Sequence, residues 1–258
     1  MSQQQALIRF DWAIKSLLRD KANFDVLEGM LSAILREEIH VEEILESESN
    51  QQECSDKFNR VDILVKDSLN RRVIIEVQNQ READYLERLL FGSSKVIIEN
   101  QHLGEGYRDV AKVISISILY FNLGSGDDYV YYGTTEFRGL HTGHPLIVRQ
   151  RIESLDAKIT YQHKKIFPEY YLINVERFQD VIASPMDEWI YMLKYAQIKD
   201  DFHSAKIHQA KEKLSLIHMS SEERQRVWLY KTTFVGFMMP RASCDTINIY
   251  RPVKVFTK

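Results

Sequence analysis

Two short apolar runs joined by a polar turn constrain the fold of this chain more than any other feature of its sequence. The runs are RVDILVK at 60–66 and RRVIIEVQ at 71–78, and the residues DSLN between them favour a tight turn. With Leu69 at the centre of the turn, residues pair across the hairpin when their numbers sum to 138. In this register one face is uniformly β-branched, because Val61, Ile63 and Val65 lie opposite Val77, Ile75 and Val73. The sequence therefore predicts a hairpin with a well-specified register.

The other face of this hairpin carries two acids. Asp62 falls opposite Glu76, and directly opposed residues have Cβ atoms about 5 Å apart, so the two like charges need compensation. A divalent cation would provide it, since Mg²⁺ prefers carboxylate, water and phosphate oxygens. Gln78 faces the same side as Glu76, and the backbone carbonyl of Val77 offers a further oxygen. The pattern predicts a metal site, although spacing alone equally fits an ordinary solvated face.

Apolar periodicity predicts the other elements. Helices are expected over 8–18, 82–100, 202–216 and 221–230, and two more are expected to begin after the capping residues Asn23 and Ser184. Strands are expected over 113–121, 129–137 and 170–175. The turn-forming residues LGSGDD at 123–128 suggest that 113–121 and 129–137 form a hairpin. We therefore expect an α/β domain over residues 1–178 and a helical C-terminal extension over residues 179–258.

Composition excludes several classes of protein. The chain has 258 residues with 44% hydrophobic and 28% charged residues, which suits a globular domain with a substantial core. No run of about 18 apolar residues exists, so we expect no membrane partner. Cys54 and Cys244 make no disulfide framework, which favours a cytoplasmic location. The absence of a Gly-rich phosphate loop argues against a nucleotide cofactor, and the net charge of −3 does not favour nucleic-acid binding.

The spacing Asp-x13-Glu-x-Gln, from Asp62 to Gln78, resembles the PD-(D/E)XK nuclease superfamily. The resemblance is closest to its Rpn-type branch of recombination-promoting nucleases and transposases, and it covers about residues 8 to 180. Further segments resemble that branch in order along the chain: Phe10-Asp11 with Lys15, Lys57 with Arg60-Val61-Asp62, Ile75-Glu76-Val77-Gln78, Tyr85-x-x-Arg88, Gly106-Tyr107 followed by the 113–121 run, and Asn174 to Phe178.

The resemblance implies a restriction-endonuclease-like α/β/α sandwich with a mixed central sheet. It also implies a DNA endonuclease linked to recombination or transposition, with Mg²⁺, or alternatively Mn²⁺ or Ca²⁺, as cofactor. Asp62 and Glu76 carry over as metal ligands, with Val77 beside them. Gln78 stands where the wider superfamily has a lysine, which orients the attacking water and offsets negative charge. A nearby cation would have to replace that charge.

Several residues outside the hairpin are candidates for supporting roles. Lys57, Arg60 and Arg88 are candidates for the replacement cation. Asp11 is either an acid of the site or an acid in the first turn of a helix, where the helix dipole favours a negative charge. Glu28 is either a third acid of the site or an exposed helix residue. DNA is the expected partner, and a homo-oligomer would allow both strands to be cut. The alternative is a catalytically inactive nuclease fold that serves as a DNA-binding or protein-interaction module.

Overall fold

The computed structural model of the chain describes residues 15, 17–18, 23–45, 62–100, 106, 110–153, 159–163 and 165–216. For 149–153, 159–163 and 215–216 it describes the backbone alone. These residues all belong to one compact unit, which comprises 1–49 and 59–216. The predictions for 8–14, 221–230 and the last stretch of the chain lie outside the described residues.

A six-stranded mixed sheet forms the centre of this unit. Its strands are β1 (Val41–Leu45), β2 (Ile63–Asp67), β3 (Arg72–Gln78), β4 (Val113–Leu119), β8 (Glu169–Asn174) and β5 (Val130–Thr134), in that spatial order. β4 runs parallel to both β3 and β8, and the remaining neighbours are antiparallel. The parallel strands require crossover connections, and the first of these contains helix α3 (Tyr85–Glu99).

The hairpin of β2 and β3 has the predicted register. Ile63 pairs with Ile75 and Val65 with Val73, so the β-branched residues meet on one face. In the turn, the Asp67 carboxylate accepts hydrogen bonds from the backbone N–H groups of Leu69 and Arg71 at 3.1 and 2.8 Å. Its side chain is almost fully buried and forms an ion pair with Arg71. The apolar pattern of the two strands and the hydrogen bonds in the turn therefore favour the same register.

The predicted hairpin between residues 113–121 and 129–137 is wrong. β4 lies between β3 and β8, and β5 pairs with β8 instead. The reason is the burial of β4, whose seven residues are all buried. A continuous apolar run of this kind is typical of a central strand in a parallel arrangement, covered on both faces. The turn-like residues that follow β4 form a longer connection to the sheet edge.

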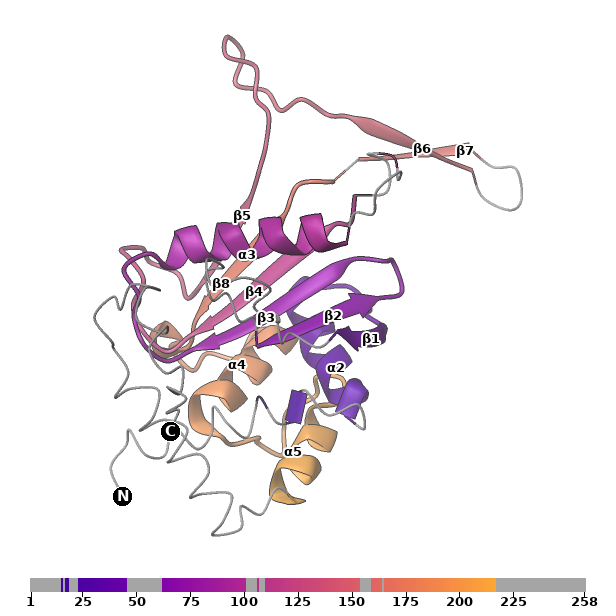
Figure 1. Cartoon of the computed structure of the whole chain (residues 1–258). Coiled ribbons are helices and arrows are strands. Elements are labelled where there is room, and N and C mark those ends of the chain that lie inside the picture. Colours follow the sequence, from indigo (N-terminus) through magenta and orange to yellow (C-terminus); the bar gives the residue numbers. More distant parts are fainter. Residues whose placement is uncertain are drawn as a thin grey trace, which may run out of the picture. The chain divides into compact units, whose positions relative to one another are not determined.

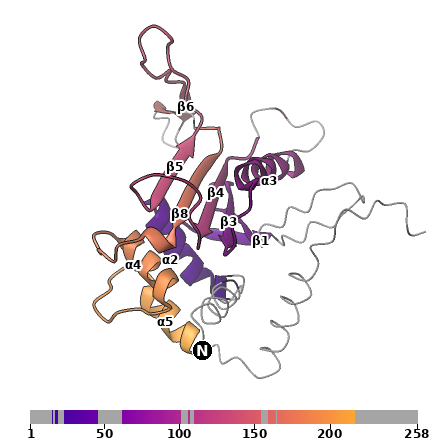
Figure 2. The same cartoon turned by 90° about the vertical axis from the view of Figure 1, so that its left-hand side faces the viewer.

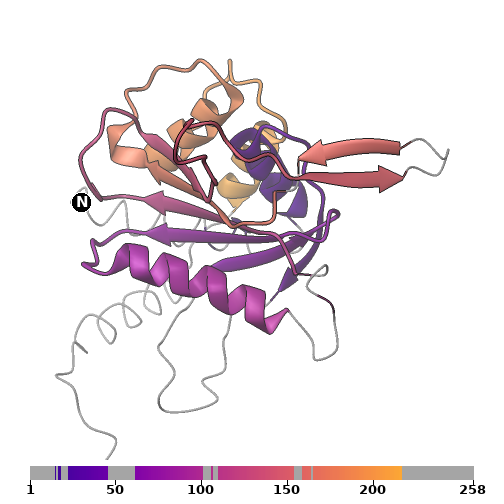
Figure 3. The same cartoon turned by 90° about the horizontal axis from the view of Figure 1, so that it is seen from above.

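Helices cover both faces of the sheet, as Figures 1, 2 and 3 show from three directions. α3 lies on one face, where Val96 packs against Leu64 and Ile74. α2 (Phe24–Leu35) and α4 (Pro185–Tyr195) lie on the other face, and α5 (Ile207–Leu216) packs against α2. These three layers confirm the predicted α/β/α arrangement around a mixed sheet.

The ends of the helices follow local chemistry. α4 begins as predicted at Ser184, which forms a capping box with Asp187. α5 begins five residues later than expected, because Glu188 of α4 accepts hydrogen bonds from the backbone N–H groups of His203 and Ser204 and holds that segment as a loop. Asn23 occupies the cap position of α2 but its side chain makes no capping bond. It donates instead to the carbonyl of Leu17 at 3.1 Å.

Three strands and a short helix were not predicted. They are the edge strand β1, the strands β6 (Arg149–Glu153) and β7 (Ile159–His163), and the 3-10 helix η3 (Val175–Arg177). β6 and β7 pair with each other in a separate two-stranded sheet. Within the described part of the chain, no helix has the length and apolar character needed to cross a membrane. The predicted domain boundary between residues 178 and 179 stays a prediction.

Candidate active site

The acidic pair lies where the β2–β3 hairpin opens. Asp62 directly precedes β2, and its Oδ2 accepts a hydrogen bond from the backbone N–H of Val77 at 2.7 Å. The same oxygen lies 3.0 Å from the Nζ of Lys15. Glu76 precedes Val77 on β3, and the charge of Asp62 contributes to raising the pKa of Glu76. The structure therefore brings together the two carboxylates that the hairpin register predicted.

Glu76 is a buried carboxylate with incomplete compensation. Its residue is only 4% exposed. Burial is the main cause that raises the pKa of Glu76, the charges of Asp62 and Glu82 raise it further, and Arg88 opposes them. Oε1 lies 3.6 Å from Nη2 of Arg88, whereas Oε2 is buried and has no hydrogen-bond partner among the described residues. A buried carboxylate oxygen without a partner is rare in proteins and points to a missing water or cation.

The backbone of β3 directs the Val77 carbonyl toward the same place. In a strand, the N–H and C=O groups of successive residues point alternately to the two neighbouring strands. The carbonyl of Gln78 accepts a hydrogen bond from Tyr120 on the β4 side. The N–H of Val77 points to the other side, where it meets Asp62. The carbonyl of Val77 consequently lies on the Asp62 side of β3, beyond the first residue of β2.

A second polar network holds Gln78 and Arg88. The Gln78 Nε2 donates to Glu82 Oε1 at 2.8 Å, and Arg88 Nη1 lies 2.8 Å from both oxygens of Glu82. Because Arg88 also faces Glu76, it links the two acids, and together they raise the pKa of Arg88 even though its burial alone would lower it. Arg88 thus lies beside the acidic pair, and its predicted role as the replacement cation stays a prediction. Glu82 was not predicted as a site residue.

Two further hydroxyl groups border Glu76, and neither was predicted as a site residue. Ser117 of β4 is the cross-strand partner of Glu76 and is fully buried. Tyr85, at the start of α3, is 1% exposed, and burial followed by the charge of Glu76 raises its pKa. The side chain of Ser117 also interacts with the Tyr85 hydroxyl, which opposes the rise in the pKa of Tyr85. The signal for Ser117 was a small polar residue in the otherwise apolar run VISISIL.

The other predicted site residues divide into two groups. Asp11, Lys57 and Arg60 lie outside the described residues, so their proposed support of the site stays a prediction. Glu28 lies on α2, where its Oε1 accepts a hydrogen bond from the backbone N–H of Val41 at 2.8 Å. Glu28 therefore holds the start of β1 rather than serving as a third site acid.

The donor atoms at this site fit a hard cation. The described residues hold no group of three or more His, Cys, Asp or Glu side chains that could bind a metal. They do hold two carboxylates, one with a buried oxygen that lacks a partner, and a backbone carbonyl on the same side. Mg²⁺ commonly uses only one or two carboxylates and takes its remaining oxygens from water and substrate phosphates.

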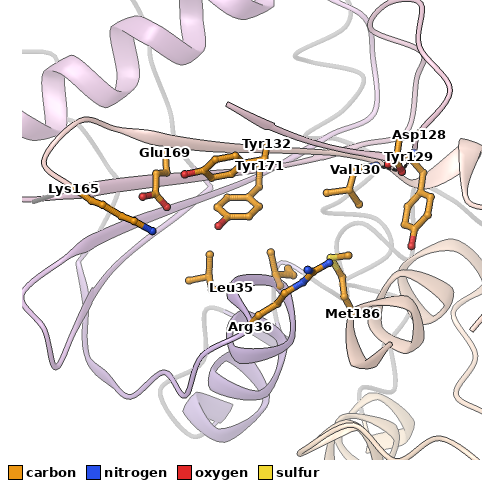
Figure 4. A pocket seen from close by; sticks show the side chains of 11 residues that line it. Leu35, Arg36, Asp128, Tyr129, Val130, Tyr132, Lys165, Glu169, Tyr171 and Met186 are labelled. Atoms are coloured by element: carbon orange, nitrogen blue, oxygen red, sulfur yellow. Dashed lines mark hydrogen bonds between the residues drawn. The ribbon is translucent and has the colours of Figure 1, made fainter. Parts of the chain in front are cut away.

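A separate pocket lies on the other face of the sheet (Figure 4). Its volume is about 500 Å³, and Tyr132, Tyr171 and Arg36 are among its lining residues. Tyr171 pairs with Ile116, which in turn pairs with Ile75. Since successive residues of a strand face opposite sides, this pocket and Glu76 lie on opposite faces. The pocket is therefore distinct from the acidic site.

Comparison with known protein families gives one match. Residues 8–232 match the family described as PD-(D/E)XK nuclease family transposase. No curated protein and no solved structure matches the chain. The match covers every element of the acidic site, from Lys15 to Arg88.

Proposed function

The chain belongs to the PD-(D/E)XK nuclease family transposases, and from this membership and the acidic site we propose that it is a divalent-metal-dependent DNA endonuclease. The observation that carries the proposal is the buried Glu76 carboxylate beside Asp62, whose Oε2 has no hydrogen-bond partner in the part of the chain that the structure describes. The family description further supports a role in DNA transposition or recombination.

We assign the metal ligands to Asp62, Glu76 and the carbonyl of Val77, with Mg²⁺ as the preferred ion. A bound Mg²⁺ would lower the pKa of a coordinated water and polarise the scissile phosphate. The N–H of Val77 orients Asp62 through the 2.7 Å hydrogen bond, so the ligand is preorganised. Arg88 holds Oε1 of Glu76, which leaves Oε2 for the cation.

Gln78 is the third proposed catalytic residue. It follows Glu76 by two positions on β3 and therefore lies on the same face. Its amide is oriented by the hydrogen bond to Glu82, which Arg88 in turn holds. An oriented amide can hydrogen-bond a water molecule or a phosphate oxygen, but it brings no charge.

The test is cleavage of supercoiled plasmid DNA by the purified protein with Mg²⁺, Mn²⁺ or Ca²⁺ in parallel. We expect nicking or linearisation with Mg²⁺ or Mn²⁺ that EDTA abolishes. Asp62→Asn and Glu76→Gln should each lower the rate at least about 100-fold, because each removes a charged ligand of the proposed catalytic metal. Glu43→Gln is the matched control, since Glu43 is an exposed acid on β1.

The contrary result is also informative. If folded protein cleaves no DNA with any of the three ions across a range of pH, the enzyme proposal is wrong. The chain would then be an inactive nuclease fold, and DNA binding without cleavage would identify it as a binding module.

A further inference from the structure

We propose that Lys15 is a catalytic residue of this site and supplies the positive charge that Gln78 lacks. The inference rests on the proposed nuclease function and adds a residue to it. In the reaction, the Lys15 ammonium would contact the scissile phosphate and stabilise the negative charge that develops there. The observation behind it is the 3.0 Å separation of Lys15 Nζ and Asp62 Oδ2.

The other two cations that the structure describes near the site, Arg88 and Lys66, each pair with acids. Arg88 binds both oxygens of Glu82 at 2.8 Å and faces Glu76 at 3.6 Å, so its charge is used to hold the site together. Lys66 lies toward the turn of the hairpin and pairs with Glu42 at 2.8 Å. Among the described residues, Lys15 is the cation that pairs with Asp62.

The backbone that carries Lys15 is well anchored. Leu17 and Leu18, which follow it, are 0% and 1% exposed. The carbonyl of Leu17 also accepts the side-chain hydrogen bond of Asn23, which explains why Asn23 makes no capping bond to α2. The position from which the Lys15 side chain extends is therefore fixed relative to α2.

The Lys15 side chain nevertheless keeps access to a substrate. It is 25% exposed, and the Asp62 side chain is 21% exposed, so the pair lies at the surface of the site. A lysine ammonium carries three donors on a flexible four-carbon stem. It can exchange the Asp62 carboxylate for a phosphate oxygen without a backbone movement. Contact with Asp62 in the absence of substrate is then the resting arrangement of a phosphate-binding cation.

A purely structural role is the competing explanation, in which the ion pair only attaches the first helical segment to the hairpin. The two roles differ in what can replace Lys15. A structural ion pair requires a cation on that segment. A catalytic charge can instead be delivered from another element, and the position of Gln78 on β3 is suitable, since it lies two residues from Glu76.

The test measures single-turnover plasmid nicking with Mg²⁺ for the full-length wild type, Lys15→Met, Gln78→Lys and the double variant. Lys15→Met keeps the length of the side chain and removes its charge. We expect its rate to fall about 100-fold or more, as for loss of one charge-stabilising donor. Addition of Gln78→Lys should restore at least about tenfold of that loss. The unfolding temperatures of the four proteins, recorded in parallel, should not differ enough to account for the differences in nicking rate.

Metal affinity provides a readout that does not depend on cleavage. Since Lys15 and the metal compete for Asp62, Lys15→Met should bind Ca²⁺ more tightly than wild type, by about two- to tenfold for removal of one neighbouring positive charge. Isothermal titration with Ca²⁺ measures this. Weaker binding or unchanged binding would contradict the proposed competition.

Three results would overturn the Lys15 proposal. They are a wild-type rate in Lys15→Met, a loss of rate that Gln78→Lys does not restore, and a loss that follows only a lower unfolding temperature. If Lys15→Met does not fold, Lys15→Gln is the second variant, because it keeps a hydrogen-bond donor for Asp62 and has no charge, and the proposal expects it to lose about 100-fold in rate. Metal-dependent, Asp62-dependent cleavage with a wild-type rate in Lys15→Gln would then reject Lys15 alone, whereas an inactive wild type would reject the nuclease function itself.

Discussion

At the scale of single residues, the ionised Glu76 carboxylate is in an unfavourable environment, and a bound cation would make it more favourable. Glu76 is buried, its pKa is raised chiefly by burial, and none of the described residues offers its Oε2 a hydrogen bond. In water the same carboxylate would be fully solvated, so its ionised form is less favourable in the folded protein. The arrangement lowers stability in the absence of metal, and this is the pattern expected for a binding site rather than a structural ion pair.

Glu76→Gln should therefore stabilise the metal-free protein, and more so as pH rises. The folded pKa of Glu76 lies above its unfolded value, so ionisation costs stability once pH exceeds the unfolded pKa, and the full cost is present above the folded pKa. Glutamine removes that cost. In a chelator, the unfolding temperature of the variant should exceed that of wild type at pH 8 by about 2–4 °C for each kcal/mol gained, and the difference should shrink toward pH 5.

The control for this experiment is Glu43→Gln, which removes an exposed carboxylate and should show no comparable pH-dependent gain. Addition of Mg²⁺ should stabilise wild type and not Glu76→Gln, because only the former retains the ligand. A Glu76→Gln variant that is less stable than wild type at pH 8 would show that the carboxylate is well compensated without metal.

Removal of Arg88 should have the opposite effect on stability. Arg88→Gln leaves Glu76 and Glu82 without their shared cation, and Glu76 is the more buried of the two. We expect the free energy of unfolding to fall by about 1–3 kcal/mol at pH 8, the usual range for an uncompensated polar group. Urea denaturation measures it, and Arg88→Lys, which keeps the charge, should lose less. Equal midpoints for Arg88→Gln and wild type would refute this role.

Residue assignments could be predicted only where a single element sets the geometry. Asp62, Glu76 and Gln78 followed from the register of one hairpin, because period-2 alternation leaves one way to align its apolar residues. Ser117 and Tyr85 come from β4 and α3, whose positions depend on the tertiary fold. Lys15 matched a family motif, but its contact with Asp62 required the packing of a distant segment against the hairpin.

At the scale of elements, the β2–β3 hairpin is specified by its own turn. The buried Asp67 carboxylate binds two backbone N–H groups and Arg71, and Asn70 adopts a left-handed conformation with φ 59°. Local chemistry of this kind can be recognised in a sequence. The neighbours of β4 could not be predicted from the sequence, because the pairing of a completely buried strand depends on the whole sheet rather than on the adjacent turn.

Asp67→Ala should weaken the hairpin without altering the chemistry of the site. The change removes the acceptor of the backbone N–H groups of Leu69 and Arg71, which costs up to about 1–3 kcal/mol for each group, and it removes the Arg71 ion pair. We expect a loss of about 2–4 kcal/mol in thermal or urea unfolding. Asn70→Gly is the matched control, because glycine also accepts a positive φ, and should change stability by less than about 0.5 kcal/mol. If Asp67→Ala matched that control, the turn network would not be the element that secures the register.

At the scale of the whole compact unit, α2 joins the sheet to α4 and α5. Trp189 of α4 is fully buried, and Gly29 of α2 lies beneath it. A Cβ at Gly29 would approach the carbonyl oxygen of Ala205 to 2.6 Å and the Cβ of Lys206 to 2.8 Å. The expected helical character of residues 185–195 was visible in the sequence, whereas the close contact with α2 was not, since glycine within a helix carries no pattern of its own.

Gly29→Ala should accordingly destabilise the protein, although alanine favours a helix over glycine by about 0.5–1 kcal/mol. Overpacking against backbone typically costs about 1–3 kcal/mol, so a net loss of about 1–2 kcal/mol is expected in urea unfolding. Gly124→Ala, where a Cβ would meet no atom within 4 Å, is the control and should have little effect. A gain in stability for Gly29→Ala would mean that α2 and the segment before α5 pack less tightly than described.

The most direct test of the central claim is a crystal structure of the protein grown with Mn²⁺, with anomalous diffraction recorded to locate the ion. We expect one peak at roughly 2.0–2.6 Å from oxygens of Asp62, Glu76 and the Val77 carbonyl, with Lys15 Nζ displaced from Asp62. A Mn²⁺ ion bound elsewhere, or no ion at these oxygens at millimolar concentration, would contradict the assignment of this site as the metal centre of a nuclease.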